Sequence, residues 1–109
     1  MSQRRVIESY ARDVGFTIDQ LNKLVVTYKM VVDSACDLNS VALSSRGDVK
    51  EAIRRAKKLG KIIDDLIDTV DFTLCTWKKY MELKAQYIDA KLDLSTIEVE
   101  VEEEIRLQG

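Results

Sequence analysis

Four aspartates spaced along one side of an expected helix are the residues of this chain best suited to metal chemistry. Asp64, Asp65 and Asp68 lie within the run "DDLID", and Asp71 follows about one turn later. Side chains three and four residues apart in a helix lie on the same face. Carboxylate oxygens are the ligands that Mg²⁺ prefers, and a bound magnesium ion can activate water for attack on a phosphate.

The acidic run matches only part of a known magnesium signature. All-α nucleoside-triphosphate pyrophosphohydrolases carry E-E-x-x-E on one helix and E-x-x-D on the next, and Asp64, Asp65 and Asp68 are placed like the first part. The second part would fall on 86–89, "QYID", where Gln86 replaces the first acid. The pattern also predicts one continuous helix through both segments, on which they would not face each other. Such an enzyme is therefore a remote alternative, and we expect no catalytic or metal site.

Other catalytic arrangements lack their residues. The chain has no histidine, which excludes Ser-His-Asp and Cys-His nucleophile systems. Its two cysteines, Cys36 and Cys75, do not form a zinc site without further ligands. Four glycines are too few for a loop that cradles phosphates. We therefore expect a protein that is not an enzyme and that needs no cofactor.

A basic run offers a candidate binding face for an anionic ligand. Positions i, i+3, i+4 and i+7 of one helical face carry Arg54, Lys57, Lys58 and Lys61. A cationic face of this kind binds phosphates electrostatically, so binding of a nucleic acid or a nucleotide is the main alternative function. The acidic tail, residues 93–106, is a competing partner for this face, within the chain or from a second copy.

The composition predicts an all-α protein. The 109 residues include no proline and only four glycines, so the frequent turns of an all-β domain are missing. Apolar residues recur at helical spacing through most of the chain. With 46% hydrophobic and 33% charged residues, the chain can form a core, and a net charge of −2 is unlike that of most nucleic-acid binders. We expect a single all-α domain over 1–109.

Glycines and capping boxes divide the chain into four predicted helices. Gly15 suits a helix end, and Thr17 with Gln20 matches a capping box. Gly47 again suits a helix end, with Asp48 as the next cap, and Ser95 is the last predicted cap. The predicted helices are 3–14, 17–43, 49–92 and 95–107.

Three local alternatives stay open at this stage. Gly15 could lie inside one long helix instead of ending a short one. Gly60 could kink its helix or could permit the close approach of a neighbouring helix. Residues 96–101 alternate between apolar and acidic residues, which is typical of a strand, although we favour a helix.

The predicted architecture is a long antiparallel helical hairpin with short N- and C-terminal helices. Its apolar stripes are too wide for one partner helix, so a further element is needed. The terminal helices could supply it, but the length of helix 49–92 favours a second copy, as in dimeric four-helix bundles. We expect a homo-oligomer with an interface formed by Val25, Tyr28, Val32, Leu66, Val70, Leu74, Trp77 and Met81.

The expected function follows from these exclusions. No apolar stretch follows Met1, which predicts no secretory signal, and no segment is apolar enough for a membrane span, so we expect a cytoplasmic protein. The predicted function is a small helical adaptor, inhibitor or accessory factor of the kind that viruses, phages and bacteria make. It would act as a homo-oligomer, with another protein as its partner.

Overall fold

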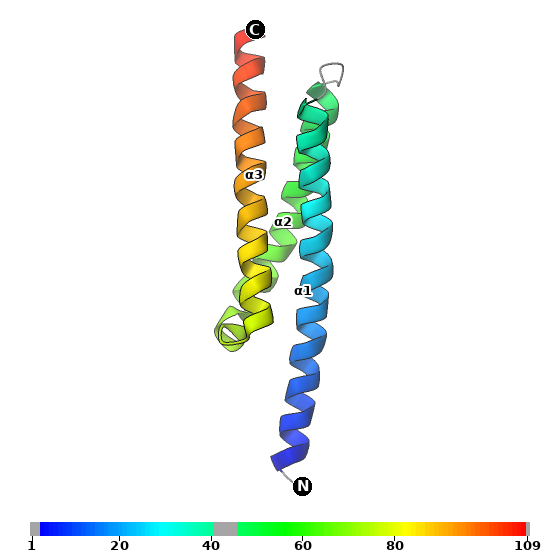
Figure 1. Ribbon diagram of the computed structural model, residues 1–109, viewed down its shortest axis with the longest axis vertical. Helices are drawn as coiled ribbons and strands as arrows, with labels where there is room; N and C mark the ends of the chain where they lie inside the picture. The colour runs from blue at the N-terminus through cyan, green and yellow to red at the C-terminus, as the bar shows by residue number, and fades with distance from the viewer. Residues whose placement is uncertain (1–2, 41–45, 109) are drawn as a thin grey trace.

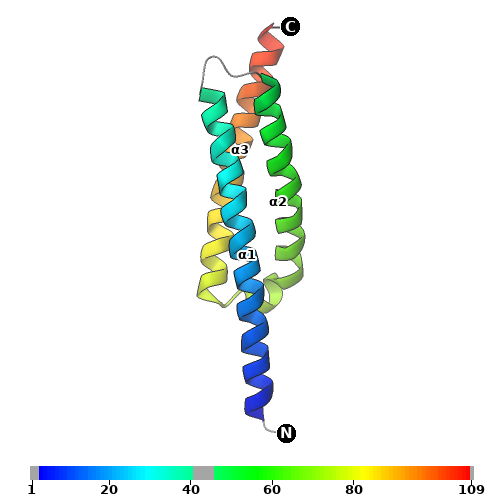
Figure 2. The same cartoon turned by 90° about the vertical axis from the view of Figure 1, so that its right-hand side faces the viewer.

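Three α-helices make up the computed structural model, which describes residues 3–40 and 46–108 (Figure 1). They are α1 (Gln3–Ser40), α2 (Arg46–Leu74) and α3 (Lys78–Gln108). The chain runs up α1, down α2 and up α3, so that α1 and α3 are parallel and α2 is antiparallel to both (Figures 1 and 2). The all-α prediction is confirmed for the described residues, but the arrangement is three long helices and not a hairpin with short terminal helices.

The first predicted helix boundary is wrong, because α1 continues through Gly15. Gly15 is exposed and has helical geometry, with no positive φ. The hydroxyl of Thr17 donates a hydrogen bond to the carbonyl oxygen of Asp13, at 3.0 Å, instead of capping a new helix. Phe16, on the other side of Gly15, is 65% exposed. The alternative of one long helix is therefore correct.

The predicted helix start near residue 49 also shifts. α2 begins at Arg46, and both Gly47 and Asp48 lie in its first turn. Gly47 has no positive φ, so it does not end the preceding helix in the left-handed conformation. The predicted end of the preceding helix at residue 43 lies outside the described residues.

The largest correction concerns the predicted helix 49–92, which is two helices. α2 ends at Leu74, and α3 begins at Lys78 after a tight turn. The backbone N–H of Trp77 donates to the carbonyl oxygen of Leu74 at 2.9 Å, and the Trp77 carbonyl accepts the first hydrogen bond of α3, from Met81 N–H at 3.0 Å. Because this turn contains neither glycine nor proline, the usual sequence signals of a helix end are missing.

The fourth predicted helix is wrong as a separate element. α3 continues through Ser95 to Gln108, and residues 96–101 are helical, so the helix interpretation of that segment is confirmed and the strand alternative is not. The hydroxyl of Thr96 donates to the carbonyl oxygen of Leu92, as within a helix. The 13 residues predicted as a separate helix, 95–107, are thus part of a 31-residue helix.

A core between the three helices buries apolar side chains from each of them. Burial of this apolar surface is the main force that holds the helices together. The third element that the apolar stripes require is thus α3 of the same chain. α1 also extends beyond the α2–α3 turn at its N-terminal end (Figures 1 and 2). The fully buried side chains include Leu21, Val25, Tyr28 and Val32 of α1, Val49 and Ile63 of α2, and Tyr80, Leu83 and Tyr87 of α3.

Candidate functional site

Three ion pairs at intervals of seven residues join α2 to α3. Lys57 pairs with Glu98, Asp64 pairs with Lys91 at 3.2 Å, and Asp71 pairs with Lys84 at 2.8 Å. Each step of seven residues along α2 is matched by seven residues along α3 in the opposite direction, as expected of antiparallel helices in contact. These pairs, which we call the ion-pair ladder, define the register of α3 on α2.

Two tyrosines strengthen the ladder from the α3 side. The hydroxyl of Tyr80 donates to Asp71 Oδ1 at 2.5 Å. The hydroxyl of Tyr87 lies 2.7 Å from Asp64 Oδ1 and 2.8 Å from the carbonyl oxygen of Gly60, so its proton bridges two acceptors. Burial, and then the hydrogen bonds to these carboxylates, raise the pKa of both tyrosines above the ordinary value. Hydrogen bonds from Lys84 and Tyr80 lower the pKa of Asp71.

Gly60 allows α2 to approach the two buried tyrosines closely. A Cβ atom at this position would lie 3.2 Å from Cε2 of Tyr28 and 3.3 Å from the hydroxyl oxygen of Tyr87. The rings of Tyr28 and Tyr87 meet edge to face, with centroids 5.0 Å apart. Of the two roles left open for Gly60, the structure supports close packing, because the space beside it is occupied by Tyr28 and Tyr87.

The ion-pair ladder divides the four aspartates at 64, 65, 68 and 71 into two sets. Asp64 and Asp71 contact α3, whereas Asp65 and Asp68 are exposed. A turn does separate the two parts of the magnesium signature, contrary to the sequence expectation. However, the α3 residues that meet Asp64 are Tyr87 and Lys91, which are donors and not carboxylates. Among residues 3–40 and 46–108, no group of three or more potential ligands is placed to hold a metal ion.

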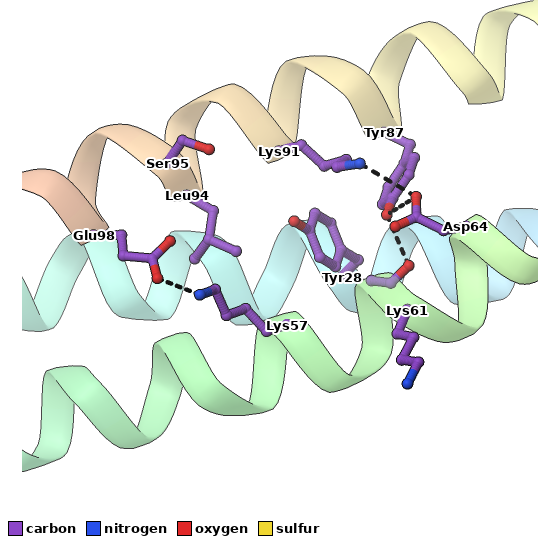
Figure 3. A pocket seen from close by; sticks show the side chains of 10 residues that line it. Tyr28, Lys57, Lys61, Asp64, Tyr87, Lys91, Leu94, Ser95 and Glu98 are labelled. Atoms are coloured by element: carbon purple, nitrogen blue, oxygen red, sulfur yellow. Dashed lines mark hydrogen bonds and ion pairs between the residues drawn. The ribbon is translucent and has the colours of Figure 1, made fainter.

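A small groove between α2 and α3 collects several of these polar residues (Figure 3). Its volume is ≈ 190 Å³, and the buried ring of Tyr28 from α1 reaches it. Burial, with a contribution from Asp64, raises the pKa of Tyr28 to about 12. Lys61 is directed away from Tyr28 and Lys91 in Figure 3. The cations at the groove do not converge on one point, and Lys57 and Lys91 are each paired with an acid.

The predicted anionic-ligand residues have different surroundings. Arg54 forms a double hydrogen bond with Glu51, at 2.7 and 3.0 Å, and Lys57 pairs with Glu98 of the acidic tail. The expected contact between the basic run and the tail is therefore made within one chain. Lys58 and Lys61 are exposed. The basic face is thus present on α2, but two of its four members are engaged by acids.

The predicted oligomer interface is mostly part of the core of a single chain. Leu66 and Val70 are half-buried against this core, while Trp77 and Met81 are 36% and 49% exposed near the α2–α3 turn. The fully or almost fully buried members of the predicted interface are Val25, Tyr28, Val32 and Leu74.

A second apolar stripe on α3 faces away from the core, and only its member Met81 was part of the predicted oligomer interface. Its large side chains, Met81, Ile88, Leu92 and Val99, are 49, 47, 63 and 54% exposed. Alternating steps of four and three residues are the spacing of a coiled-coil contact. We call the set with this spacing the outer seam; it consists of Met81, Ala85, Ile88, Leu92, Ser95 and Val99. Ser95 lies at the edge of this seam and also lines the groove between α2 and α3 (Figure 3).

The covered face of α3 has the same spacing. We call it the inner seam, and it lies about a quarter to a half turn around the helix from the outer seam. α3 is therefore apolar on two faces. The spacing of both stripes can be read from the sequence, but the sequence analysis considered a single apolar stripe in this segment. The inner seam consists of Tyr80, Leu83, Tyr87, Ala90, Leu94, Ile97 and Val101.

Comparisons with known proteins add no relative: no protein-family model, curated protein sequence or solved structure matches this chain. Within the described ranges, no helix combines the length and apolar character that a membrane span requires.

Proposed function

We propose that this chain is a non-enzymatic helical interaction protein that acts through protein–protein contacts and works as a homo-oligomer. The outer seam of α3 is the observation that carries the proposal. Single exposed apolar residues are normal on a protein surface, whereas a row of them at coiled-coil spacing is typical of a helix-binding face. Leu92 at its centre is 63% exposed.

The use of the polar residues within the fold supports a role without catalysis. Asp64 and Asp71, which made magnesium chemistry conceivable, hold the lysines and tyrosines of α3. Lys57 from the basic run holds Glu98. These side chains have a structural use, and their removal would disturb the contact between α2 and α3.

Binding of nucleic acid through the basic face remains the alternative proposal. The outer side of α2 carries exposed Lys58 and Lys61, but it becomes acidic at Asp65 and Asp68, within two turns. An anionic polymer that follows the helix would meet repulsion in its second half. We therefore favour the protein partner.

Native mass spectrometry of the protein purified from its source cells tests the proposal. We expect species heavier than the 12.5 kDa chain, either an oligomer or a complex with another protein. Leu92→Gln should reduce them to the single chain. Met30→Gln is the matched control, because Met30 is equally exposed, at 65%, on α1. A 12.5 kDa species alone, or equal assembly of Leu92→Gln and wild type, would contradict the proposal.

A further inference from the structure

We propose that the groove between α2 and α3 binds a small zwitterion of the α-amino-acid type, with the hydroxyl of Tyr28 as a hydrogen-bonding group at its floor. The groove lies between two pairs of the ion-pair ladder, Lys57–Glu98 and Asp64–Lys91 (Figure 3). Its volume of ≈ 190 Å³ equals that of about six water molecules at ~30 Å³ each. The groove therefore has room for a small amino acid, and it is smaller than the ~300–1,000 Å³ typical of pockets for larger ligands.

Gly60 helps to open the groove, because it lines the space without a side chain. The two ion pairs on either side are seven residues apart along α2, or about 10 Å at ~1.5 Å per residue. Leu94 lines the groove from α3. The space between the ion pairs is thus bordered by backbone on one wall and by an apolar side chain on the other, and its polar groups lie at the ends and at the floor.

The Tyr28 side chain is buried, yet its hydroxyl has no partner within the described chain. The side chain is 1% exposed and reaches from α1 to the groove, where Figure 3 shows its hydroxyl directed toward the space between Leu94 and Lys91. Within residues 3–40 and 46–108, no group forms a hydrogen bond with this hydroxyl, in contrast to that of Tyr87, which has two acceptors. Buried hydroxyls are normally hydrogen-bonded, so a ligand that accepts the Tyr28 proton would satisfy it. Burial raises the pKa of Tyr28 to about 12, which keeps that proton in place near neutral pH.

The charges around the groove favour a ligand with no net charge. Lys57 lies on α2 at one end and Lys91 lies on α3 at the other, and the acids Glu98 and Asp64 occupy the two remaining corners (Figure 3). Lys61 also lines the groove, but its side chain is directed away from Tyr28 and Lys91. A small anion or cation between the two pairs would meet like charges as well as opposite ones. A zwitterion can place each of its charges beside an opposite one.

Both ion pairs keep hydrogen-bonding capacity for such a ligand. A lysine ammonium has three donors, and a carboxylate has several acceptor positions, so one contact between them leaves others unused. The carboxylate of the ligand would accept from the Tyr28 hydroxyl and from Lys57 or Lys91, while its ammonium would donate to Glu98 or Asp64. The ligand's own side chain would pack on the apolar wall of the groove.

A matched set of small molecules tests the ligand class at pH 7. L-Valine carries both charges, isovalerate lacks its ammonium, and isobutylamine lacks its carboxylate. In titrations of the full chain followed by NMR, we expect L-valine or the smaller glycine to bind in the millimolar range and to shift the signals of Gly60 and Leu94. Isovalerate and isobutylamine should bind at least about tenfold more weakly, because each loses one charged contact. Absence of binding by both amino acids, or equal binding of isovalerate and L-valine, would overturn the proposal.

Tyr28→Phe separates ligand binding from packing, since it removes the hydroxyl and keeps the ring. Because this hydroxyl has no partner within the described chain, the urea midpoint should not fall, whereas the Kd for L-valine should rise about tenfold. Tyr10→Phe, at an exposed site on α1, is the matched control and should change neither quantity. An unchanged Kd in Tyr28→Phe would overturn the proposal. So would a lowered urea midpoint, because it would show that the hydroxyl already has a partner in the fold.

The ligand site and the proposed contact between chains can fail independently. Tyr28 belongs to α1 and Leu92 to the outer seam, so Leu92→Gln should lose assembly in the native mass spectra and keep its affinity for L-valine. Tyr28→Phe should show the reverse pattern. Loss of L-valine binding in Leu92→Gln would place the site outside the groove and would overturn the proposal.

Discussion

The inner and outer seams of α3 have the same spacing and opposite surroundings. Leu83 on the inner seam is fully buried against the other helices, whereas Leu92 on the outer seam is 63% exposed. Both residues are leucines on one helix. Coiled-coil spacing thus predicts a contact face on both sides of α3, and within one chain only the inner seam is covered by the other helices.

The comparison also separates the stability of a single chain from the proposed role of the outer seam in assembly. The inner seam and the ion-pair ladder fix α3 within one chain, so changes there should act at any protein concentration. The outer seam contributes little to a single chain, and its effect should grow with concentration through mass action. The predictions below use this distinction, and they begin with the largest expected effect.

Truncation of the two leucines should give very different losses of stability. Leu83→Ala leaves a cavity in the core and should lower the free energy of unfolding by about 2–5 kcal/mol. Leu92→Ala should change it by less than about 0.5 kcal/mol in dilute solution. Urea denaturation monitored by circular dichroism at low concentration measures both. Equal losses would show that the inner and outer assignments are wrong.

Removal of the Tyr87 hydroxyl should have the next largest effect. Tyr87→Phe leaves the Gly60 carbonyl and Asp64 without this donor. The substitution should therefore lower the free energy of unfolding by about 1–3 kcal/mol. Because the pKa of Tyr87 is raised above 10.0 in the folded state, its contribution is present below pH 10 and is lost as the pH rises further. Tyr87→Phe should lose less stability than wild type above pH 10. Tyr10→Phe, at a 46% exposed site, is the control.

Two of the helical glycines, Gly15 and Gly60, should respond in opposite directions to substitution by alanine. At Gly15 an added Cβ meets no atom within 4 Å, so Gly15→Ala should stabilise α1 by about 0.5–1 kcal/mol. At Gly60 the same atom would lie 3.2 Å from the buried ring of Tyr28. We expect Gly60→Ala to lower the free energy of unfolding by about 1–3 kcal/mol, because crowding against the tyrosine ring outweighs the gain in helix propensity. Thermal unfolding of both variants measures the difference, and stabilisation by Gly60→Ala would contradict the close packing of α2.

The smallest expected effect is the loss of stability at low pH when the ion pair of Asp71 in the ladder is removed. Lys84 and Tyr80 lower the pKa of Asp71 below 3.8, so its contribution to stability is present above that pH and is lost as the pH falls through the folded-state pKa. Asp71→Asn should therefore be less stable than wild type at pH 7, and the two should converge at the acid end. Urea titrations from pH 7 down to the acid limit measure this, with exposed Asp65→Asn as the control. A constant difference at all pH values would contradict the pairing of Asp71.

Much of the fold, but not its helix boundaries, could be predicted from the sequence. Composition and periodicity indicated the all-α class. The stripe through Val25, Tyr28 and Val32 was predicted as an oligomer interface, and the structure places it in the core of a single chain. The turn after Leu74 was missed because residues 75–77 lack glycine and proline. Conversely, Gly15 fits within a helix that is held by packing of its neighbours, such as buried Val14 and Ile18. Tertiary packing thus overrides local signals in both cases.

The register of α2 on α3 was present in the sequence in a form that local reasoning does not use. Charged residues at 57, 64 and 71 match those at 98, 91 and 84 only when the chain reverses near residue 77. Recognition of that reversal requires a comparison of distant segments. The same missing turn explains why Leu74, Trp77 and Met81 were grouped in one stripe, although Leu74 is buried and the other two are exposed.

Sedimentation equilibrium of the purified wild-type chain and of Leu92→Gln, over a wide range of concentrations, tests the central claim most directly. The claim is that the outer seam of α3 joins two copies of this protein. We predict that the wild-type mass rises from 12.5 kDa to twice that value with increasing concentration, while Leu92→Gln remains at 12.5 kDa. A wild-type chain that remains at 12.5 kDa throughout, or a Leu92→Gln variant that dimerises as strongly as wild type, would contradict it.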